Sequence, residues 1–332
     1  MPVIESSFTP SALVRAATVQ TIMPSVARRV SDPGFRREIL ELPDGDFLEL
    51  DWLPQGSSRL AIINHGLEGS TASGYLRGMA QALFSAGYDV LAWNMRGCGT
   101  ERNRLKTWYH SGQSDDLRHV IARALTTHKG PVALVGFSIG GNILLKYLGE
   151  EGSNISSQIR AAVAISVPMD LANSAEQLAD PRNAIYMSYL LKPLRARILE
   201  KATRFPGDFD TTGLDKMRTF REFDDRFTAP FHGFSSVEEY WEHASSLRFL
   251  DTIALPTLAL SALDDPFLSP GCFPTEQASA SQHLFLETPK HGGHVGFISG
   301  FGLKTTWAEQ RVPEFLAPYL AESAQRGFRM WA

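Results

Sequence analysis

The segment around Ser138 constrains this chain more than any other. Four apolar residues, 132–135, lead directly into Gly136-Phe137-Ser138-Ile139-Gly140, and apolar residues at helical spacing follow at once. A short apolar run before a helix is typical of a buried strand, so this G-x-S-x-G pattern lies in a sharp strand-to-helix turn. Glycines keep side chains out of the crowded turn, which pushes the serine hydroxyl clear of the backbone. The pattern therefore predicts a reactive Ser138 at the end of a buried strand.

Strand and helix patterns alternate along most of the chain. The predicted strands are a hairpin over 37–53, with Asp44-Gly45 as a two-residue turn, and single strands at 60–63, 90–93, 132–135, 161–165, 256–260 and 283–286. Helices are predicted over 75–84, over 117–125 and directly after Ser138. This alternation predicts an α/β fold with a mostly parallel central sheet and helices on both faces.

The interval between Val167 and Leu255 interrupts that rhythm. It has helical patches and no clear strand, and an ordinary crossover needs far fewer residues. We interpret residues 170–250 as a helical cap inserted into a core of 36–169 and 251–332, preceded by an N-terminal arm over 1–35. The alternative is a peripheral helical decoration with no role at the site.

Two histidines, His291 and His294, follow the last predicted strand. Serine is a weak nucleophile at neutral pH and needs a base. His294 is the leading candidate, because a loop at this place lets its side chain reach across the carboxyl edge of the sheet. His291 is the alternative base. A metal held by both histidines is a weaker interpretation, since no thiolate or obvious carboxylate partner lies nearby in the sequence.

An acidic pair, Asp264-Asp265, follows the preceding strand. A base of this kind needs a carboxylate that fixes its tautomer and stabilises the imidazolium. We favour Asp265, because Pro266 fixes the turn just after it, and we assign Asp264 to orienting the loop. Asp170 is an outside candidate. The resulting order of serine, aspartate and histidine is the one found in α/β-hydrolases.

Two backbone N–H groups are predicted to stabilise a developing oxyanion. One belongs to Ile139, directly after the serine, and the other to Leu67, in the loop after strand 60–63. His65 in that loop is expected to be a structural hydrogen-bonding residue. Arg96, in Arg96-Gly97-Cys98-Gly99, is expected to belong to a structured turn, with a clamp for substrate charge as the alternative.

Composition excludes several classes of protein. With 32 basic and 36 acidic residues the net charge is −4, which is unsuited to nucleic-acid binding. Two cysteines, Cys98 and Cys272, cannot build a disulfide framework or a thiolate zinc site and favour a cytoplasmic location. No apolar stretch is long enough to span a membrane. Residues 6–31 contain three arginines and no acid, which leaves peripheral membrane contact open, although a packed structural arm is favoured.

Several motifs together resemble the bacterial YheT-like hydrolases, which are related to eukaryotic α/β-hydrolase-domain proteins acting on lipid esters. They cover most of the chain, from about residue 18 to 320. The motifs are 20–24 (Gln-Thr-Ile-Met-Pro), 42–47, 65–70, 96–98, 109–112, 136–142, 264–267 and 291–297. The resemblance implies an α/β-hydrolase fold, the catalytic set Ser138, Asp265 and His294, and no cofactor.

These observations predict a serine hydrolase that cleaves carboxylic esters through an acyl-enzyme. Short-chain esters and acylglycerols are the substrates that the resemblance implies. Acyl transfer and thioester hydrolysis would use the same residues, and a non-catalytic ligand-binding protein is the alternative from another class. Seven phenylalanines in the predicted cap are expected either to pack it on the core or to line an acyl pocket. They are Phe205, Phe209, Phe220, Phe223, Phe227, Phe231 and Phe234.

Overall fold

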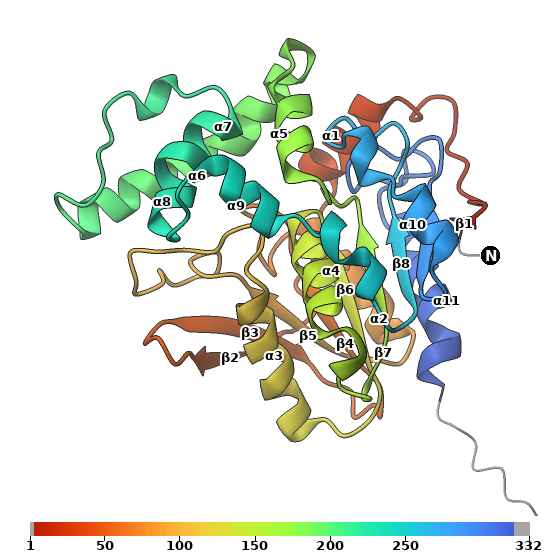
Figure 1. Ribbon diagram of the computed structural model, residues 1–332. Coiled ribbons are helices and arrows are strands. Elements are labelled where there is room, and N and C mark those ends of the chain that lie inside the picture. Colours follow the sequence, from red (N-terminus) through yellow and green to blue (C-terminus); the bar gives the residue numbers. More distant parts are fainter. Residues whose placement is uncertain (1–2, 322–332) are drawn as a thin grey trace, which may run out of the picture.

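A nine-stranded sheet forms the centre of the molecule (Figure 1). The structure is a computed structural model that describes residues 3–321. The strand order is β1-β9-β8-β7-β6-β4-β5-β3-β2. The first seven strands in this order pair in parallel, and β3 is antiparallel to both of its neighbours, β5 and β2. The strands are β1 (Val3–Ile4), β2 (Arg36–Glu41), β3 (Phe47–Leu53), β4 (Leu60–Asn64), β5 (Asp89–Asn94), β6 (Val132–Phe137), β7 (Ile159–Ile165), β8 (Thr257–Leu260) and β9 (Leu284–Glu287). The predicted mostly parallel sheet is confirmed.

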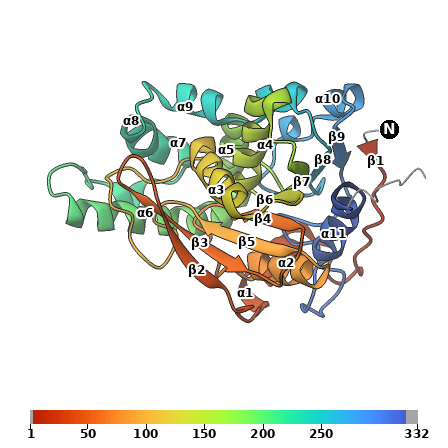
Figure 2. The same ribbon diagram turned by 90° about the horizontal axis from the view of Figure 1, so that it is seen from below.

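Helices cover both faces of this sheet, as predicted. Figure 2 shows α2 and α11 on one face and α3 and α4 on the other. Successive residues of β6 point to opposite faces, so Leu134 joins the apolar core on the α4 side and Val135 the core on the α2 side. The helices are α1 (Ala17–Ala27), α2 (Gly74–Ser85), α3 (Ser114–Thr127), α4 (Ile139–Glu151), α5 (Leu171–Ala179), α6 (Ala184–Arg204), α7 (Phe220–Phe223), α8 (Ala229–Phe231), α9 (Val237–Ala244), α10 (Thr275–Ala280) and α11 (Trp307–Leu320).

The turn of the β2–β3 hairpin differs from the predicted turn at Asp44-Gly45. Gly45 N–H donates to the carbonyl of Leu42, so Pro43 and Asp44 are the central residues of the turn. Gly45 follows with φ of 86°, and Leu42 N–H pairs with Asp46. A turn followed by a left-handed glycine makes a longer hairpin loop than the two-residue turn expected at Asp44-Gly45.

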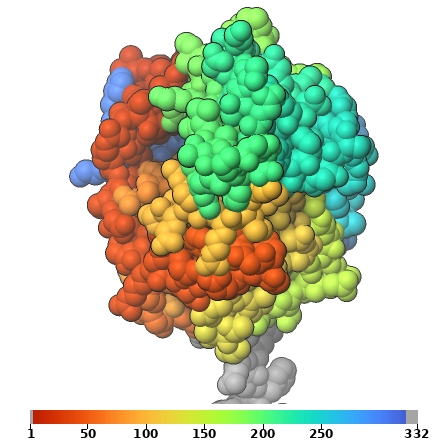
Figure 3. Space-filling view, turned by 90° about the vertical axis from the view of Figure 1, so that its left-hand side faces the viewer, coloured from red at the N-terminus to blue at the C-terminus, as the bar shows by residue number. Residues whose placement is uncertain are grey.

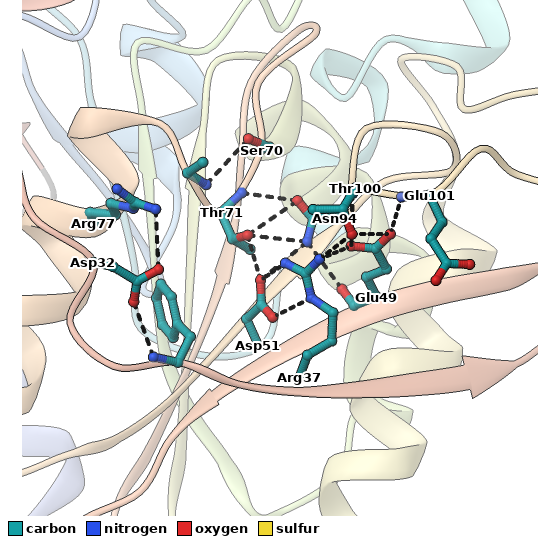
Figure 4. Close-up of polar contacts among 12 residues, drawn as sticks. Asp32, Arg37, Glu49, Asp51, Ser70, Thr71, Arg77, Asn94, Thr100 and Glu101 are labelled. Carbon is teal, nitrogen blue, oxygen red and sulfur yellow. Dashed lines mark hydrogen bonds and ion pairs between the residues drawn. The ribbon is translucent and has the colours of Figure 1, made fainter.

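A buried carboxylate at the other end of this hairpin, that of Asp51, helps to fix the loop that leads into α2. Asp51 of β3 accepts two hydrogen bonds from Arg37, at 2.7 and 2.6 Å, and one from Thr71 Oγ1 (Figure 4). Thr71 N–H in turn donates to Asn94 Oδ1 of β5 at 2.9 Å. Because buried polar groups must be paired, this network holds the segment after residues 65–69 against the sheet.

Residues between β7 and β8 form α5 to α9, and this segment contains no strand in the described structure. We call residues 170–250 the insertion. The N-terminal segment adds β1 to the sheet edge and carries α1. The predicted domain boundaries stay a prediction, and residues 1–2 of the arm and 322–332 of the core lie outside the described residues.

Candidate active site

Ser138 lies in a strained turn between β6 and α4. Its φ of 51° and ψ of −123° are unusual for a residue with a side chain. The flanking residues have to be glycines, because a Cβ on Gly140 would lie 2.2 Å from the carbonyl oxygen of His65 and one on Gly136 would lie 2.6 Å from that of Gly140. The local sequence thus forces the serine side chain out at the carboxyl end of β6.

His294 contacts Ser138 directly. Its Nε2 lies 3.0 Å from Ser138 Oγ, and its Nδ1 lies 2.8 Å from Asp265 Oδ2. The imidazole stacks on the ring of Phe267, with centroids 4.2 Å apart. An Nδ1 proton donated to the carboxylate leaves Nε2 free to accept the serine proton. The structure therefore brings together the three side chains that the sequence singled out.

The neighbouring candidates lie elsewhere. Asp265 is fully buried, and its second oxygen accepts the N–H of Phe267. Asp264 accepts the N–H of Gly293 at 2.9 Å and lies 3.3 Å from Nδ1 of the half-exposed His291, so it braces the histidine loop. Asp170 caps α5 through the N–H of Asn173. The geometry favours Asp265 and His294 over their rivals.

The N-terminal arm holds the histidine loop from outside, a contact that the sequence analysis did not assign. Thr21 Oγ1 of α1 accepts the N–H of His294 at 3.0 Å. Gln20, fully buried beside it, donates to the carbonyl of Ile298 and accepts the N–H of the same residue. These two residues open the segment 20–24 that the family resemblance singled out, but their role depends on contacts with residues more than 270 positions away.

The loop after β4 presents an unused N–H group near the serine. His65 is fully buried, accepts the N–H of Met95 and lies 2.7 Å from the carbonyl of Gly66. Burial lowers the pKa of His65 to about 4, so it stays neutral and structural, as expected. Gly66 N–H donates to Tyr75 Oη. Within residues 3–321, the N–H groups of Leu67 and Ile139 have no acceptor, which leaves both free for a ligand oxygen.

A buried ion pair joins this loop to the insertion. Arg197 of α6 donates to both carboxylate oxygens of Glu68, at 2.9 and 3.0 Å. Tyr109 Oη accepts the N–H of Glu68 at 2.8 Å and donates to its carboxylate. Glu68 itself has a φ of 50°. Because Glu68 directly follows Leu67, this cluster fixes the peptide that carries the Leu67 N–H.

Arg96 belongs to a structured turn, and its charge is neutralised within the chain. It makes a bidentate contact with the buried carboxylate of Asp116, at 2.8 and 2.7 Å, and a further pair with Asp44. A guanidinium held in this way is unsuited to clamping a substrate charge. Arg96 therefore connects the loop after β5 to α3, through Asp116, and to the β2–β3 hairpin, through Asp44.

An apolar cavity of about 430 Å³ opens onto Ser138 and His294. Its volume lies within the range of small-molecule sites. The body contributes Gly66, Leu67 and Ile139, and α1 contributes Ile22 and Val26. The insertion contributes mostly apolar side chains, among them Leu171, Leu178 and Leu194.

Two of the seven predicted phenylalanines, Phe220 and Phe223, line this cavity. Phe209 and Phe231 instead stack on each other at 4.3 Å, and Phe231 also packs on Trp108 of the body. Some phenylalanines of the insertion thus pack against other rings, and others line the cavity. Contacts between segments distant in the sequence determine the role of each one.

Asp224 also lines the cavity, together with the ion-paired acids Glu68 and Glu309. It lies in a short π-helical segment, Asp224–Thr228, and accepts hydrogen bonds from Thr228 Oγ1 at 2.6 Å and Trp241 Nε1 at 2.9 Å. Burial raises the pKa of Asp224 to about 6.

Among residues 3–321 no cluster of three or more histidine, cysteine or acidic side chains could hold a metal ion. Nor does any helix of that described range have the length and apolarity to cross a membrane.

The chain matches proteins of one fold family. The family model for the alpha/beta hydrolase fold matches residues 62–301. "Putative esterase YheT" of Escherichia coli is 37% identical over 314 residues, which cover 91% of this chain and 90% of that protein. "Phospholipase ABHD3" of Mus musculus is 28% identical over 310 residues, or 90% of this chain and 75% of that protein.

A solved structure extends the likeness to the fold. The esterase Pf2001 of Pyrococcus furiosus aligns with a TM-score of 0.61 at 18% identity, covering 90% of this chain and 97% of that one. The chain belongs to the α/β-hydrolase fold family and, within it, to the YheT-like hydrolases. The resemblance stated from the motifs is confirmed.

Proposed function

We propose that this chain, a carboxylic ester hydrolase, acts through Ser138, His294 and Asp265 as a catalytic triad. Relatives named esterase and phospholipase support the class of reaction. The observation that carries the assignment of residues is the continuous contact from Ser138 Oγ through His294 to Asp265, at 3.0 and 2.8 Å, beside an apolar cavity.

In the first half of the reaction, Ser138 Oγ attacks the carbonyl carbon of the ester while His294 Nε2 takes its proton. Asp265 stabilises the imidazolium and holds its tautomer. The imidazolium then protonates the leaving alcohol, and an acyl-Ser138 ester remains. In the second half His294 deprotonates a water molecule, which attacks the acyl carbon. The bond from that carbon to Ser138 Oγ then breaks, the proton returns from His294 to Oγ, and the carboxylic acid leaves.

The carbonyl oxygen gains negative charge in both tetrahedral intermediates. We assign its stabilisation to the free N–H groups of Leu67 and Ile139, which the chain leaves without acceptors. Both belong to segments fixed before substrate arrives: Leu67 by the Glu68 cluster and Ile139 by the first turn of α4. Donors of this kind act without reorganisation at the moment of reaction.

We further propose that residues 170–250 act as a cap over the site and that the substrate is a small or lipid-like ester. The support is the apolar lining that the insertion gives to the cavity. Short-chain esters and acylglycerols fit such a lining. A cytoplasmic location, which the two free cysteines favour, stays a prediction.

A fluorophosphonate probe tests the nucleophile. The wild-type chain should be labelled at Ser138, and Ser138→Ala should lose both the label and ester turnover, by a factor on the order of 10⁶. Ser111, another serine of the cavity lining, offers a matched control, since Ser111→Ala should keep the label. Turnover of Ser138→Ala within tenfold of wild type would contradict the assignment, as would labelling lost in the control instead.

A further inference from the structure

Three exposed apolar side chains lie around the opening of the cavity that holds Ser138. Ile185, Tyr189 and Val26 are 74%, 69% and 59% exposed, and all three also line the cavity. A single exposed apolar residue needs no explanation, but several at the entrance of a binding cavity indicate a contact surface. We call these three residues the rim.

The rim has two sides on different elements. Ile185 and Tyr189 lie one turn apart on α6 and share a face of that helix, whereas Val26 lies in the last turn of α1. Figure 3 shows the surface hollowed between the N-terminal arm, in red, and α6, in green, with blue segments from near the C-terminus inside. Thr306 and Glu309 of that part of the chain line the cavity, which identifies the hollow as its mouth.

Exposed cations without acidic partners occur on the same two segments as the rim residues. Lys192 continues the exposed face of α6 one turn beyond Tyr189, and Arg15 and Arg29 lie on the arm. In the described part of the chain none of these three cations forms an ion pair, and Arg29 donates only to the carbonyl of Val26. Residues 6–31 of the arm contain no acid that could compensate Arg15 and Arg29.

Two acids near the ends of the rim elements are already neutralised. Asp180, just before α6, pairs with Arg182 at 2.8 Å, and Asp32, after α1, pairs with Arg77 at 3.2 Å. The apolar rim therefore lies on segments whose unpaired charges, Lys192 and Arg29 among them, are positive, in a protein whose overall net charge is −4.

This combination matches an anionic lipid surface. Apolar and tyrosine side chains enter the interface, while lysine and arginine stay at the level of the headgroup phosphates. A protein partner seated on the rim would close the way to Ser138, whereas a lipid layer would supply esters to it. The supply of esters to Ser138 rests on the proposed function, but binding to the lipid surface does not.

We propose that the rim, Val26, Ile185 and Tyr189, docks the protein on an anionic lipid surface, so that the cavity mouth faces the lipid. Contact is peripheral: side chains of the rim enter the interfacial region, and the helices that carry them lie on it. A lipid ester then passes from the layer into the cavity without crossing open water.

Vesicle flotation with the full chain tests this proposal without any ester turnover. Vesicles of phosphatidylcholine with about one third phosphatidylglycerol should bind the wild-type protein more strongly than phosphatidylcholine alone. The double variant Ile185→Ser/Tyr189→Ser should lose about tenfold or more in partitioning, because both side chains leave the interface. Lys192→Glu should weaken binding to the anionic vesicles alone.

Leu199 provides the matched control. It is 53% exposed and lies on the same exposed stripe of α6, but it does not line the cavity. Leu199→Ser should bind vesicles like wild type, and circular dichroism should give the same folded spectrum for every variant. Absence of wild-type binding, or an equal loss in Leu199→Ser, would overturn the proposal. A dimer that dissociates in Ile185→Ser/Tyr189→Ser would also overturn it, since a second copy would then cover the rim.

Ester hydrolysis keeps the two proposals apart. If the protein hydrolyses a soluble p-nitrophenyl ester but binds no vesicles, the docking proposal is wrong and the proposed function stands. If the protein binds anionic vesicles through the rim but the probe labels no serine, the proposed function is wrong and the docking proposal stands.

Discussion

The body and the insertion contribute to the site in different ways. The body supplies Ser138, Asp265 and His294 from loops at the carboxyl ends of β6, β8 and β9, where parallel strands bring distant segments together. The insertion supplies cavity wall and the buried Arg197, which pairs with Glu68 of the body. Reacting groups thus lie on loops that leave the sheet, and the insertion adds much of the wall that surrounds a substrate.

This division predicts separate effects of substitution. Changes in the body should alter the rate for every ester, while changes in the insertion should alter which ester reacts best. Arg197 is the exception that joins the two regions, because it belongs to the insertion and contacts the loop of the body that carries Leu67.

After the loss of the nucleophile itself, the largest effect is expected for the carboxylate of the body. Asp265→Asn should lower kcat by about 10⁴, because an amide facing His294 Nδ1 favours the wrong tautomer. Asp264→Asn is the matched control and should lose far less, since Asp264 contacts the N–H of Gly293 and the outer edge of His291. Steady-state kinetics on one p-nitrophenyl ester compare the two; a reversed order would move the role to Asp264.

A smaller effect is expected where the two regions meet. Arg197→Met leaves the carboxylate of Glu68 one of its three hydrogen bonds, that from Tyr109, and no cation, so the Leu67 peptide should lose its fixed position. As Arg197 is a positioning residue, kcat should fall by about 10 to 100-fold with little change in KM. Adding Glu68→Gln should recover thermal stability, because it removes the unpaired buried charge.

Lys201→Met is the control for that experiment. Lys201 is also buried on α6, but it donates to Asn103 Oδ1 and to the carbonyls of Leu105 and Thr107, away from the Leu67 loop. It should lower stability and leave kcat unchanged. A loss of kcat in both variants would mean that α6 acts only by holding the fold together.

The same contrast explains what the sequence could predict. The places of Ser138, Asp265 and His294 follow from local patterns, since each directly follows a recognisable strand, and strand ends of a parallel sheet converge. Thr21 and Arg197 carry no such local signal. Their contacts join residues 273 and 129 positions apart, which only the packed molecule brings together.

Local signals also failed where an element is very short or a turn depends on register. Strand β1 has two residues and no pattern of its own, and it exists because β9 offers a free edge. In the β2–β3 hairpin, the pairing of Glu41 with Phe47 leaves five residues between the strands, so Gly45 serves as the left-handed residue after the turn and not within it.

Within the insertion, the next effect concerns the choice of substrate. Phe220→Ala and Phe223→Ala should enlarge the cavity and shift the optimum among p-nitrophenyl esters of graded chain length, in steps of about tenfold in kcat/KM. Phe205→Ala is the matched control, because Phe205 does not line the cavity and its ring faces Lys106, Lys201 and Arg204, none of which lines it. It should lower stability and keep the wild-type profile. An unchanged profile in all three folded variants would show that the insertion does not select chain length.

The smallest effect concerns Asp224 and depends on pH. Its raised pKa of about 6 means that the folded protein favours the protonated carboxyl, while the unfolded chain ionises near its ordinary value of 3.8. The folded state therefore loses stability as pH rises from about 4 to 6, and the loss is complete above that range. Asp224→Asn cannot ionise and escapes this loss. Its free energy of unfolding relative to wild type should improve by about 1 to 3 kcal/mol between pH 4 and pH 7.

Asp180→Asn is the control with the opposite sign. The exposed carboxylate of Asp180 pairs with Arg182, which lowers its pKa to about 2. This group stabilises the folded state above the ordinary pKa and loses that contribution as pH falls toward 2, so the variant should lose stability at neutral pH relative to acid pH. Urea unfolding at several pH values measures both variants. Parallel curves for Asp224→Asn and wild type would mean that water reaches Asp224 through the cavity and that its carboxyl titrates as an exposed group.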